Sequence, residues 1–410
     1  MRPKNRARQV GATIQQTKPK HVVVLGAGLA GLAAADRLGR NGHEVTLLET
    51  QSRIGGRAFT IQGVLADGLL AETGPARYPP HLTRIFGLAR RLGLEVEPFY
   101  PRSGTVVAYL GGKRIERYEP SPEEFWGYTS LRNAYPGLIE RSTIRVALRM
   151  RAWLRRVLGK VPWATYRIRG GTHRLAEALA SECKADIQLE TTVESVSQSA
   201  TGVHVGFRKR EGRGTVDADY AVCAVPLSRV NTLSFSPALS QEKTALASEV
   251  PFHSAVRIFL QMRRPYWRDD GHNGFGVTDT LGEIWDPHFD QNREPALLVC
   301  YAKDELARQI GELNETERLE YAITELEKVF PGAAAHFETG TSYFWDHQPW
   351  IGGGWPRIRE FASRAKVFRE PEGRVYFAGD YAADPRWLNM AEGAVESGQR
   401  AAESIAKRQR

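Results

Sequence analysis

The chain contains little sulfur and no long apolar segment. Among its 410 residues are 3 cysteines and 4 methionines. Cys183, Cys223 and Cys300 are far apart, which excludes the short cysteine spacing of zinc sites and predicts no disulfide framework. We therefore expect a reducing compartment, the cytoplasm. No run reaches the ~18 apolar residues of a membrane-spanning helix, so we do not expect a membrane protein.

Negative charge is also scarce relative to positive charge. The chain has 56 Lys and Arg residues against 47 Asp and Glu residues, a net charge of +9. A basic surface attracts anions, but the arginines are widely spread and no nucleic-acid-binding module is recognisable, so we expect no nucleic-acid partner. Residues 1–20 are basic and lack the apolar core of a secretory signal, which predicts a disordered tail. The arginine-rich segment 141–160 is interpreted as a domain helix with a solvated basic face, the alternative being a helix on a membrane surface.

Residues 22–49 carry a nucleotide-binding pattern. An apolar run at 22–25 predicts a buried strand, a glycine-rich turn and an Ala/Leu-rich helix follow, and a second strand is predicted at 45–48. Such a βαβ unit places a pyrophosphate on the helix N-terminus and a ribose hydroxyl on the acidic residue after the second strand. The residues predicted to make these contacts are Gly26, Gly28, Ala30, Gly31 and Glu49.

The residues beyond this unit distinguish between dinucleotides. A Gly-Gly pair stands between Arg53 and Arg57, where fixed positive charge suits a diphosphate. Near the other end, a predicted strand ends in Gly379-Asp380, and the stretch 390–398 (MAEGAVESG) opens the last helix. Together these motifs resemble the flavin-containing amine oxidase family, and the resemblance extends from about His21 to Ala406.

The resemblance implies an α/β fold, in which a Rossmann-like FAD-binding domain of the two-dinucleotide-binding type is joined to a second, α+β substrate domain of mixed sheet and helices. The FAD-binding domain is expected to comprise 21–76, 165–240 and 366–406, and the substrate domain 77–164 and 241–365. Apolar patterns predict strands at 187–189, 193–196, 202–207, 215–223 and 254–262, and a helix at 315–330. The further FAD contacts implied are Arg57, Gly74, Pro75, Ala76, Arg77, Val193, Gly379, Asp380, Ala391 and Ala394.

Arg77 is the main candidate for substrate binding. The stretch Gly74-Pro75-Ala76-Arg77 resembles a motif of L-amino acid oxidases and tryptophan 2-monooxygenase, in which the arginine pairs with the substrate carboxylate. A guanidinium fork binds a carboxylate through two parallel hydrogen bonds. The alternative is a structural arginine bonded to Glu72 or to a loop carbonyl.

Aromatic residues are predicted on the facing wall. The loop Trp350–Trp355 is similar to the Ser-Gly-Gly-x-Tyr loop of monoamine oxidases, in some of which x is a cysteine that carries the flavin. Here x is Gly354, so non-covalent FAD is expected. Trp355 would form one wall of an aromatic cage, Trp387 falls near the second wall, and Tyr343 belongs to the same aromatic group.

Arg257 departs from the family pattern. It stands where the family usually carries a lysine that holds water beside the flavin and is thought to assist reoxidation by oxygen. Arginine stays charged and cannot act as a base. Arg257 is therefore expected to bind water or an acidic group of the substrate, and oxidase-type oxygen reactivity is left open.

These residues predict an FAD-dependent oxidase that removes hydride from the α-carbon of an aromatic or bulky L-amino acid, giving an imine, then an oxo acid, ammonia and hydrogen peroxide. Three alternatives stay open: an oxidase of amines without a carboxylate, oxidative decarboxylation as in tryptophan 2-monooxygenase, and, from another class, a flavin-dependent desaturase or isomerase. The expected partners are the small-molecule substrate and molecular oxygen. No metal is expected, and a homodimer is left open.

Overall fold

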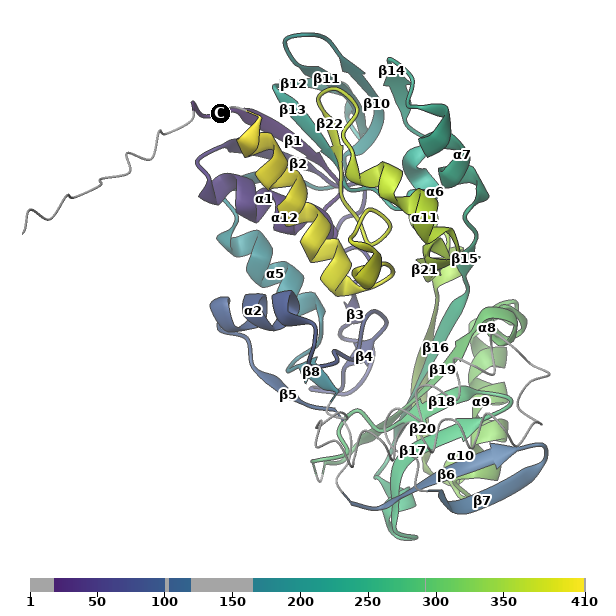
Figure 1. Ribbon diagram of the computed structural model, residues 1–410. Helices are drawn as coiled ribbons and strands as arrows, with labels where there is room; N and C mark the ends of the chain where they lie inside the picture. The colour runs from purple at the N-terminus through teal and green to yellow at the C-terminus, as the bar shows by residue number, and fades with distance from the viewer. Residues whose placement is uncertain (1–17, 100–102, 119–164, 292, 409–410) are drawn as a thin grey trace, which may run out of the picture.

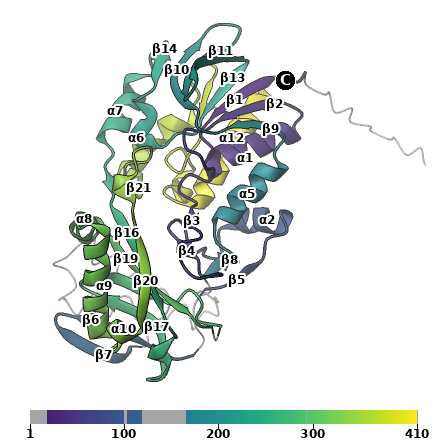
Figure 2. The ribbon, with the colours of Figure 1, turned by 180° about the vertical axis from the view of Figure 1, so that it is seen from behind.

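The computed structural model describes residues 18–99, 103–118, 165–291 and 293–408. The segment 141–160 and most of the predicted tail lie outside these residues. In the described part the chain forms an elongated molecule with one large sheet toward each end (Figures 1 and 2). Among the helices of the described residues, none is both long and apolar enough to cross a membrane.

The first large sheet is five-stranded and parallel, in the order β22-β13-β1-β2-β9. Its strands are β1 (His21–Leu25), β2 (Glu44–Leu48), β9 (Ala185–Gln188), β13 (Tyr220–Cys223) and β22 (Val375–Phe377). Strands from the beginning, middle and end of the sequence thus lie side by side. The sheet confirms the Rossmann-like fold class predicted from the βαβ pattern.

Both faces of this sheet are covered, because alternate residues of a strand point to opposite sides. Val22 and Val24 of β1 pack with α1 (Leu29–Arg40), α5 (His173–Glu182) and α12 (Ala391–Lys407). Val23 and Leu25 pack on the other side, toward a smaller four-stranded sheet and α6 (Leu227–Val230). A strand covered on both faces is apolar throughout, as β1 is.

The smaller sheet corrects one expectation. The apolar stretch 215–223 was predicted as a single strand, but it contributes to two strands in different sheets. β12 (Gly212–Ala218) pairs with β11 (Val203–Lys209), whereas β13 starts at Tyr220 and joins the five-stranded sheet. The other strands of the four-stranded sheet are β10 (Thr192–Gln198) and β14 (Ser234–Ser236). Asp219 lies between β12 and β13. It accepts hydrogen bonds from the backbone N–H of His21 and the side chain of Lys20, which fixes the point where the chain changes sheets.

The second large sheet has seven strands in the order β20-β16-β19-β18-β17-β6-β7. These are β6 (Thr105–Leu110), β7 (Lys113–Tyr118), β16 (Ala255–Met262), β17 (His272–Thr278), β18 (Gly282–Trp285), β19 (Ala296–Lys303) and β20 (Phe337–Phe344). β16 and α9 (Glu315–Val329) confirm the strand predicted at 254–262 and the helix predicted at 315–330 to within a residue. α8 (Asp304–Gly311) and α10 (Ala333–His336) are the other α-helices beside this sheet.

The alternation along β16 decides which side chains face the site. Val256, Ile258, Leu260 and Met262 belong to the core formed with α9. Ala255 and Phe259 belong to the core on the opposite side. Arg257 lies between these two, so it points away from α9 and toward the other part of the molecule.

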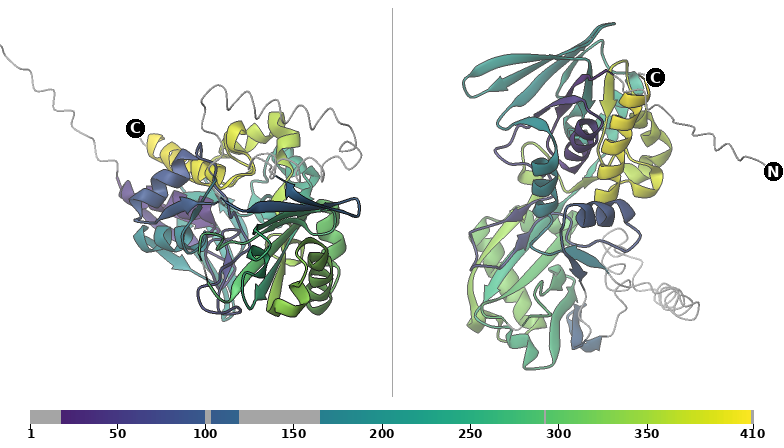
Figure 3. Two further views of the ribbon diagram at one scale, coloured as in Figure 1. Left: turned by 90° about the horizontal axis from the view of Figure 1, so that it is seen from below. Right: turned by 90° about the vertical axis from the view of Figure 1, so that its left-hand side faces the viewer.

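Short elements connect the two parts (Figure 3). Three two-stranded pairs are formed by β3 (Thr60–Ile61) with β4 (Ala71–Glu72), β5 (Val96–Pro98) with β8 (Tyr166–Ile168), and β15 (Phe252–His253) with β21 (Trp355–Pro356). α2 (Thr83–Arg91) packs on α12, and the carboxylate of Glu392 accepts the N–H groups of Arg84 and Ile85 at 2.9 and 3.0 Å. α7 (Gln241–Glu249) and α11 (Ala362–Ala365) complete the α-helices of the described residues. The domain limits given above stay a proposal.

Candidate functional site

A cavity of about 710 Å³ is lined by residues of both parts. It collects most of the residues singled out from the sequence. Those that line it are Gly26, Gly28, Ala30, Glu49, Arg57, Gly74, Pro75, Ala76, Arg77, Val193, Arg257, Trp355, Gly379, Asp380, Ala391 and Ala394. Gly31, Tyr343 and Trp387 are not among the lining residues.

The N-terminus of α1 opens into the cavity at Gly28. The first N–H groups of a helix have no intrahelical partner, and the helix dipole adds positive potential there. The first turn of α1 contains no acidic residue that would oppose an anion. A Cβ atom built on Gly28 would meet nothing within 4 Å, so the backbone is accessible from the cavity, as a diphosphate requires. A Cβ on Gly31 would instead lie 1.9 Å from the carbonyl oxygen of Gly26, so Gly31 serves the close packing of helix on turn.

Glu49 braces the glycine turn as well as facing the cavity. Its carboxylate accepts the N–H of Ala27 at 2.7 Å and that of Gln51 at 2.9 Å. Burial raises the pKa of Glu49, against the lowering effect of these hydrogen bonds and of Arg53. The contact with Ala27 could not be anticipated from spacing alone, whereas the contact of Glu49 with a ribose stays a prediction.

Arg57 joins the two terminal motifs. It donates two hydrogen bonds to the carboxylate of Asp380, at 3.0 and 2.6 Å, and a longer one to the carbonyl of Gly354 at 3.3 Å. The Gly-Gly-Arg stretch, the Gly-Asp stretch and the Trp350–Trp355 loop therefore meet at one guanidinium. The positive charge of Arg57 is balanced by Asp380. The N-terminus of α1 would therefore supply part of the positive potential that a diphosphate requires.

Arg77 contacts Glu283, a residue that no sequence motif identified. Its Nη1 donates to Glu283 of β18 at 2.7 Å, and Lys303 at the end of β19 donates to the other oxygen of the same carboxylate at 2.6 Å. Glu283 is fully buried. A carboxylate in the interior is costly unless it is paired, and here it is paired twice.

Arg257 occupies the next position on the same wall. In the register of the sheet, Arg257 of β16 and Glu283 of β18 both lie opposite Tyr301 of β19. The Arg257 guanidinium is 4.5 Å from the Tyr301 ring centroid and donates through Nη1 to the backbone carbonyl of Glu72. Its Nε is buried and has no hydrogen-bond partner in the structure. Burial lowers the pKa of Arg257 from that of a free arginine.

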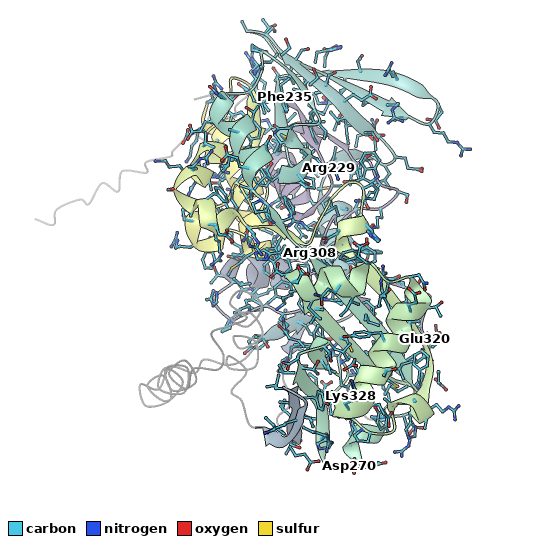
Figure 4. All side chains as sticks on the ribbon, turned by 90° about the vertical axis from the view of Figure 1, so that its right-hand side faces the viewer. Arg229, Phe235, Asp270, Arg308, Glu320 and Lys328 are labelled. Carbon is cyan, nitrogen blue, oxygen red and sulfur yellow. The ribbon has the colours of Figure 1, made fainter. Side chains whose placement is uncertain are left out.

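Trp355 lines the cavity with an unexpected neighbour, His253. The two residues face each other in the β15–β21 pair, and their rings stack with centroids 4.9 Å apart at 29°. His253 donates from Nδ1 to Asp304 at 2.7 Å, and Arg357 donates to the same carboxylate oxygen at 3.3 Å. His253, Asp304 and Arg357 all line the cavity. Their site lies where the two parts of the molecule meet, close to Arg308 of α8 (Figure 4).

The other two predicted aromatic residues, Tyr343 and Trp387, do not line the cavity. Trp387 stacks on His81, with centroids 5.8 Å apart, while Asn389 and Met390 of the same loop reach the cavity. Tyr343 packs edge-on against Trp345, which does line the cavity and donates to the carbonyl of Thr73 at 3.0 Å.

Both the sequence and the fold of the chain are similar to those of known proteins. Residues 29–157 and 145–406 match the family described as flavin containing amine oxidoreductase. The chain belongs to this family. It is therefore a flavin oxidoreductase that acts on amines, and the implied cofactor is FAD. The accessible helix N-terminus at Gly28 and the orphaned Nε of Arg257 fit such a cofactor and its polar substrate.

Individual relatives are distant but span nearly the whole chain. An L-amino-acid oxidase of Siganus canaliculatus is 26% identical, covering 97% of this chain and 88% of that protein. The flavin-dependent L-tryptophan oxidase RebO of Lentzea aerocolonigenes is 24% identical, covering 94% of this chain and 98% of that protein. The solved structure of a putrescine oxidase variant superimposes with a TM-score of 0.77 at 22% identity, covering 95% of this chain and 99% of that one, which supports the fold.

Proposed function

We propose that the enzyme oxidises the carbon that bears the amine of an L-amino acid, with an aromatic or bulky side chain. The observation that carries the proposal is the charge of one cavity wall. Three cations, Arg77, Arg257 and Lys303, line the cavity, and two of them, Arg77 and Lys303, share the carboxylate of the buried Glu283. A surplus of positive charge favours a substrate that brings a carboxylate of its own. Glu72, which lies behind the wall, has a pKa raised by burial, against the lowering effect of Arg257 and its hydrogen bonds.

The apolar part of the substrate would pack against the aromatic wall. Trp345 and Trp355 line the cavity beside the cationic wall. A flat or bulky side chain buries apolar area on these rings, which favours the aromatic class over small amino acids. The naming of relatives as L-amino-acid oxidase and L-tryptophan oxidase agrees with this class.

The protein would act mainly by holding and orienting the substrate. When bound, FAD accepts the hydride from the C–H bond beside the amine. The cationic wall holds the substrate carboxylate while Trp355 holds the side chain, so the reacting carbon is fixed in one orientation. The product is an imine that water converts to an oxo acid and ammonia, with oxygen reduced to hydrogen peroxide.

The second candidate is oxidation of an amine that has no carboxylate. It is favoured by one specific observation: Arg77 already pairs with a carboxylate of the protein, Glu283, at 2.7 Å. In that case the cluster would be structural, and Arg77 would have no part in substrate selection.

Matched substrate pairs separate the two candidates. Purified enzyme is mixed anaerobically with L-phenylalanine or phenethylamine, and with L-tryptophan or tryptamine, and the loss of flavin absorbance is followed. The proposal expects faster flavin reduction by the amino acid of each pair, and Arg77→Ala lowers that rate while leaving the slow rate with the amine nearly unchanged. Faster reduction by the amines, with Arg77→Ala harming both alike, would establish the second candidate instead. Peroxide release in air then reports whether oxygen is the acceptor.

A further inference from the structure

We infer that His253, oriented by Asp304, accepts the proton that the substrate ammonium must lose before oxidation. The inference rests on the amine-oxidising function proposed above. It concerns a pair of residues that no sequence motif identified and that the cationic wall does not include.

The chemistry requires a proton acceptor near the bound amine. Aliphatic amines enter as ammonium ions at neutral pH, because the pKa of an alkyl ammonium is near ~10. Hydride leaves the neighbouring carbon only when the nitrogen lone pair is free. The cations Arg77, Arg257 and Lys303 of the same cavity disfavour a positive charge on the nitrogen of the bound substrate and so promote loss of this proton.

The geometry places His253 at the right part of the cavity. It lines the cavity together with Ala255 and Lys303, and its ring stacks on Trp355, so the imidazole and Trp355 border the same part of the cavity. Its Nδ1 is engaged by Asp304 at 2.7 Å, which leaves Nε2 as the nitrogen that exchanges a proton. The side chain is 23% exposed, so a proton taken up from the substrate can pass on to water.

Asp304 is held in place at a conformational cost. It has a φ of +52°, which is unusual for a residue with a side chain, and its N–H donates to the carbonyl of Ser254 at 2.9 Å. Strained backbone of this kind persists only where the surroundings impose it, and it concentrates at functional sites. Burial raises the pKa of Asp304, but the hydrogen bond from His253 and the charge of Arg357 outweigh burial, so the net pKa lies below its usual value. The carboxylate is thus ionised and stabilises an imidazolium.

Other charges near the pair come from each element packed on β15. Arg357 follows β21 and Lys303 precedes α8. Ser254, next to His253, accepts a hydrogen bond from Arg308 of α8 at 3.2 Å and donates one to Asp346 of η2 (Trp345–His347) at 2.5 Å. Glu360 of η3 (Ile358–Phe361) lines the same cavity.

In the proposed step the substrate N–H bond breaks, an Nε2–H bond forms on His253, and the imidazolium faces Asp304. The proton then leaves to water, and no redox partner takes part.

The test compares substrates that differ in how readily they lose the proton. Anaerobic flavin reduction is measured with L-phenylalanine and phenethylamine, and with the β,β-difluoro analogue of each, whose ammonium group is much more acidic. For whichever parent compound is oxidised, His253→Gln should lower the second-order rate of reduction roughly 10²-fold at neutral pH. The loss should be far smaller with the difluoro analogue and should disappear at alkaline pH, where the parent amine is already neutral.

Three further variants separate proton transfer from mechanical support of Trp355. His253→Phe keeps a stacked ring and should lose as much as His253→Gln, while Asp304→Asn should show a partial loss with the same dependence on substrate acidity. His336 stacks on Tyr266 at 4.7 Å outside the cavity lining, so His336→Gln is the matched control and should keep the native rates. An equal loss with both analogues at every pH, or no loss, would overturn the inference. Failure of every amine and amino acid to bleach the native flavin would instead refute the proposed function, and this inference with it.

Discussion

Arg57 and Asp380 are 323 positions apart in the sequence and share two hydrogen bonds, of 3.0 and 2.6 Å. The pair joins the residues after β2 to the residues after β22, and the carbonyl of Gly354 accepts a third, longer hydrogen bond from the same arginine. One guanidinium therefore fixes the relative positions of three stretches that line the cavity.

We expect Arg57→Lys to weaken FAD binding, because a single ammonium group cannot replace the planar fork. Loss of a hydrogen bond to a charged group costs roughly 1.5–3 kcal/mol, which predicts about a tenfold to hundredfold weaker retention. The measurement is the FAD content after dialysis of equal amounts of protein. Arg364→Lys alters an exposed pair with Glu249 and should leave FAD content unchanged. Equal FAD content in the two variants would contradict the prediction.

Two glycines of the same turn should respond differently to substitution. Gly28→Val places a side chain in open space at the helix N-terminus, so the apoprotein should fold normally but fail to retain FAD. Gly31→Ala places a methyl group 1.9 Å from a backbone oxygen, so it should destabilise the fold itself. Circular dichroism melting of the apoproteins and flavin absorbance of the purified proteins distinguish these outcomes. A yellow Gly28→Val protein would argue against a diphosphate at α1.

The Arg77–Glu283–Lys303 cluster should be strongly coupled. Glu283→Gln leaves two cations without their shared carboxylate, and breaking a buried ion pair from one side costs about 3–5 kcal/mol. The double variant Glu283→Gln with Lys303→Met should be more stable than the single Glu283→Gln variant. The double variant no longer buries the Lys303 ammonium without the carboxylate of Glu283. Urea unfolding measures both. Glu305→Gln, which breaks an exposed pair with Arg308, should cost less than about 1 kcal/mol and serves as the control.

Arg257→Lys tests the departure from the family pattern. The native guanidinium is held by the Tyr301 ring and the Glu72 carbonyl. A lysine at this place restores a compact, mobile ammonium group beside the cavity. We expect faster reoxidation of the reduced flavin by oxygen, with little change in anaerobic reduction, as measured by stopped-flow absorbance of the two half-reactions. If reduction slows and reoxidation is unaffected, Arg257 acts on the substrate instead.

FAD should come off the native protein on acid precipitation, since Gly354 offers no thiol. A cysteine there would be crowded, because a Cβ atom on Gly354 would lie 3.0 Å from the Cβ of Ala255 and 3.1 Å from the carbonyl of His253. Gly354→Cys is thus expected to lower the melting temperature. Flavin that stays in the acid pellet of the native protein would show a covalent link elsewhere.

The sequence was sufficient for the features that are local. The βαβ unit was predictable because the apolar run of β1, the glycines and Glu49 are continuous in the chain. β16 and α9 were also found, since their apolar patterns are long. The split of residues 215–223 was not predictable, because both β12 and β13 have strand-like composition and only the tertiary pairing separates them.

The site was only partly predictable, because its charges pair across distant strands. Glu283 and Lys303 lie within or at the end of apolar strands, and a charge in such a strand was the one available signal. Neither their distance to Arg77 nor the His253–Asp304 pair follows from spacing, since these residues come from three strands, the start of α8 and the loop that carries Arg77. Trp387 does not line the cavity, whereas Asn389, which has a positive φ, and Met390 of the same loop do, so its place in an aromatic cage stays a prediction.

The interleaved order of the five-stranded sheet also bears on how the enzyme is made. Gly379, Asp380, Ala391 and Ala394 line the cavity but are synthesised after nearly all of the other lining residues. A nascent chain has the glycine turn and Glu49 early, yet it lacks the strand beside β13 and the helix beside α1. Until residues 375–394 have left the ribosome, the nucleotide pocket has no closing wall. Flavin capture should therefore follow the synthesis of residues 375–394, and added FAD should bind chains that contain these residues but not shorter nascent chains.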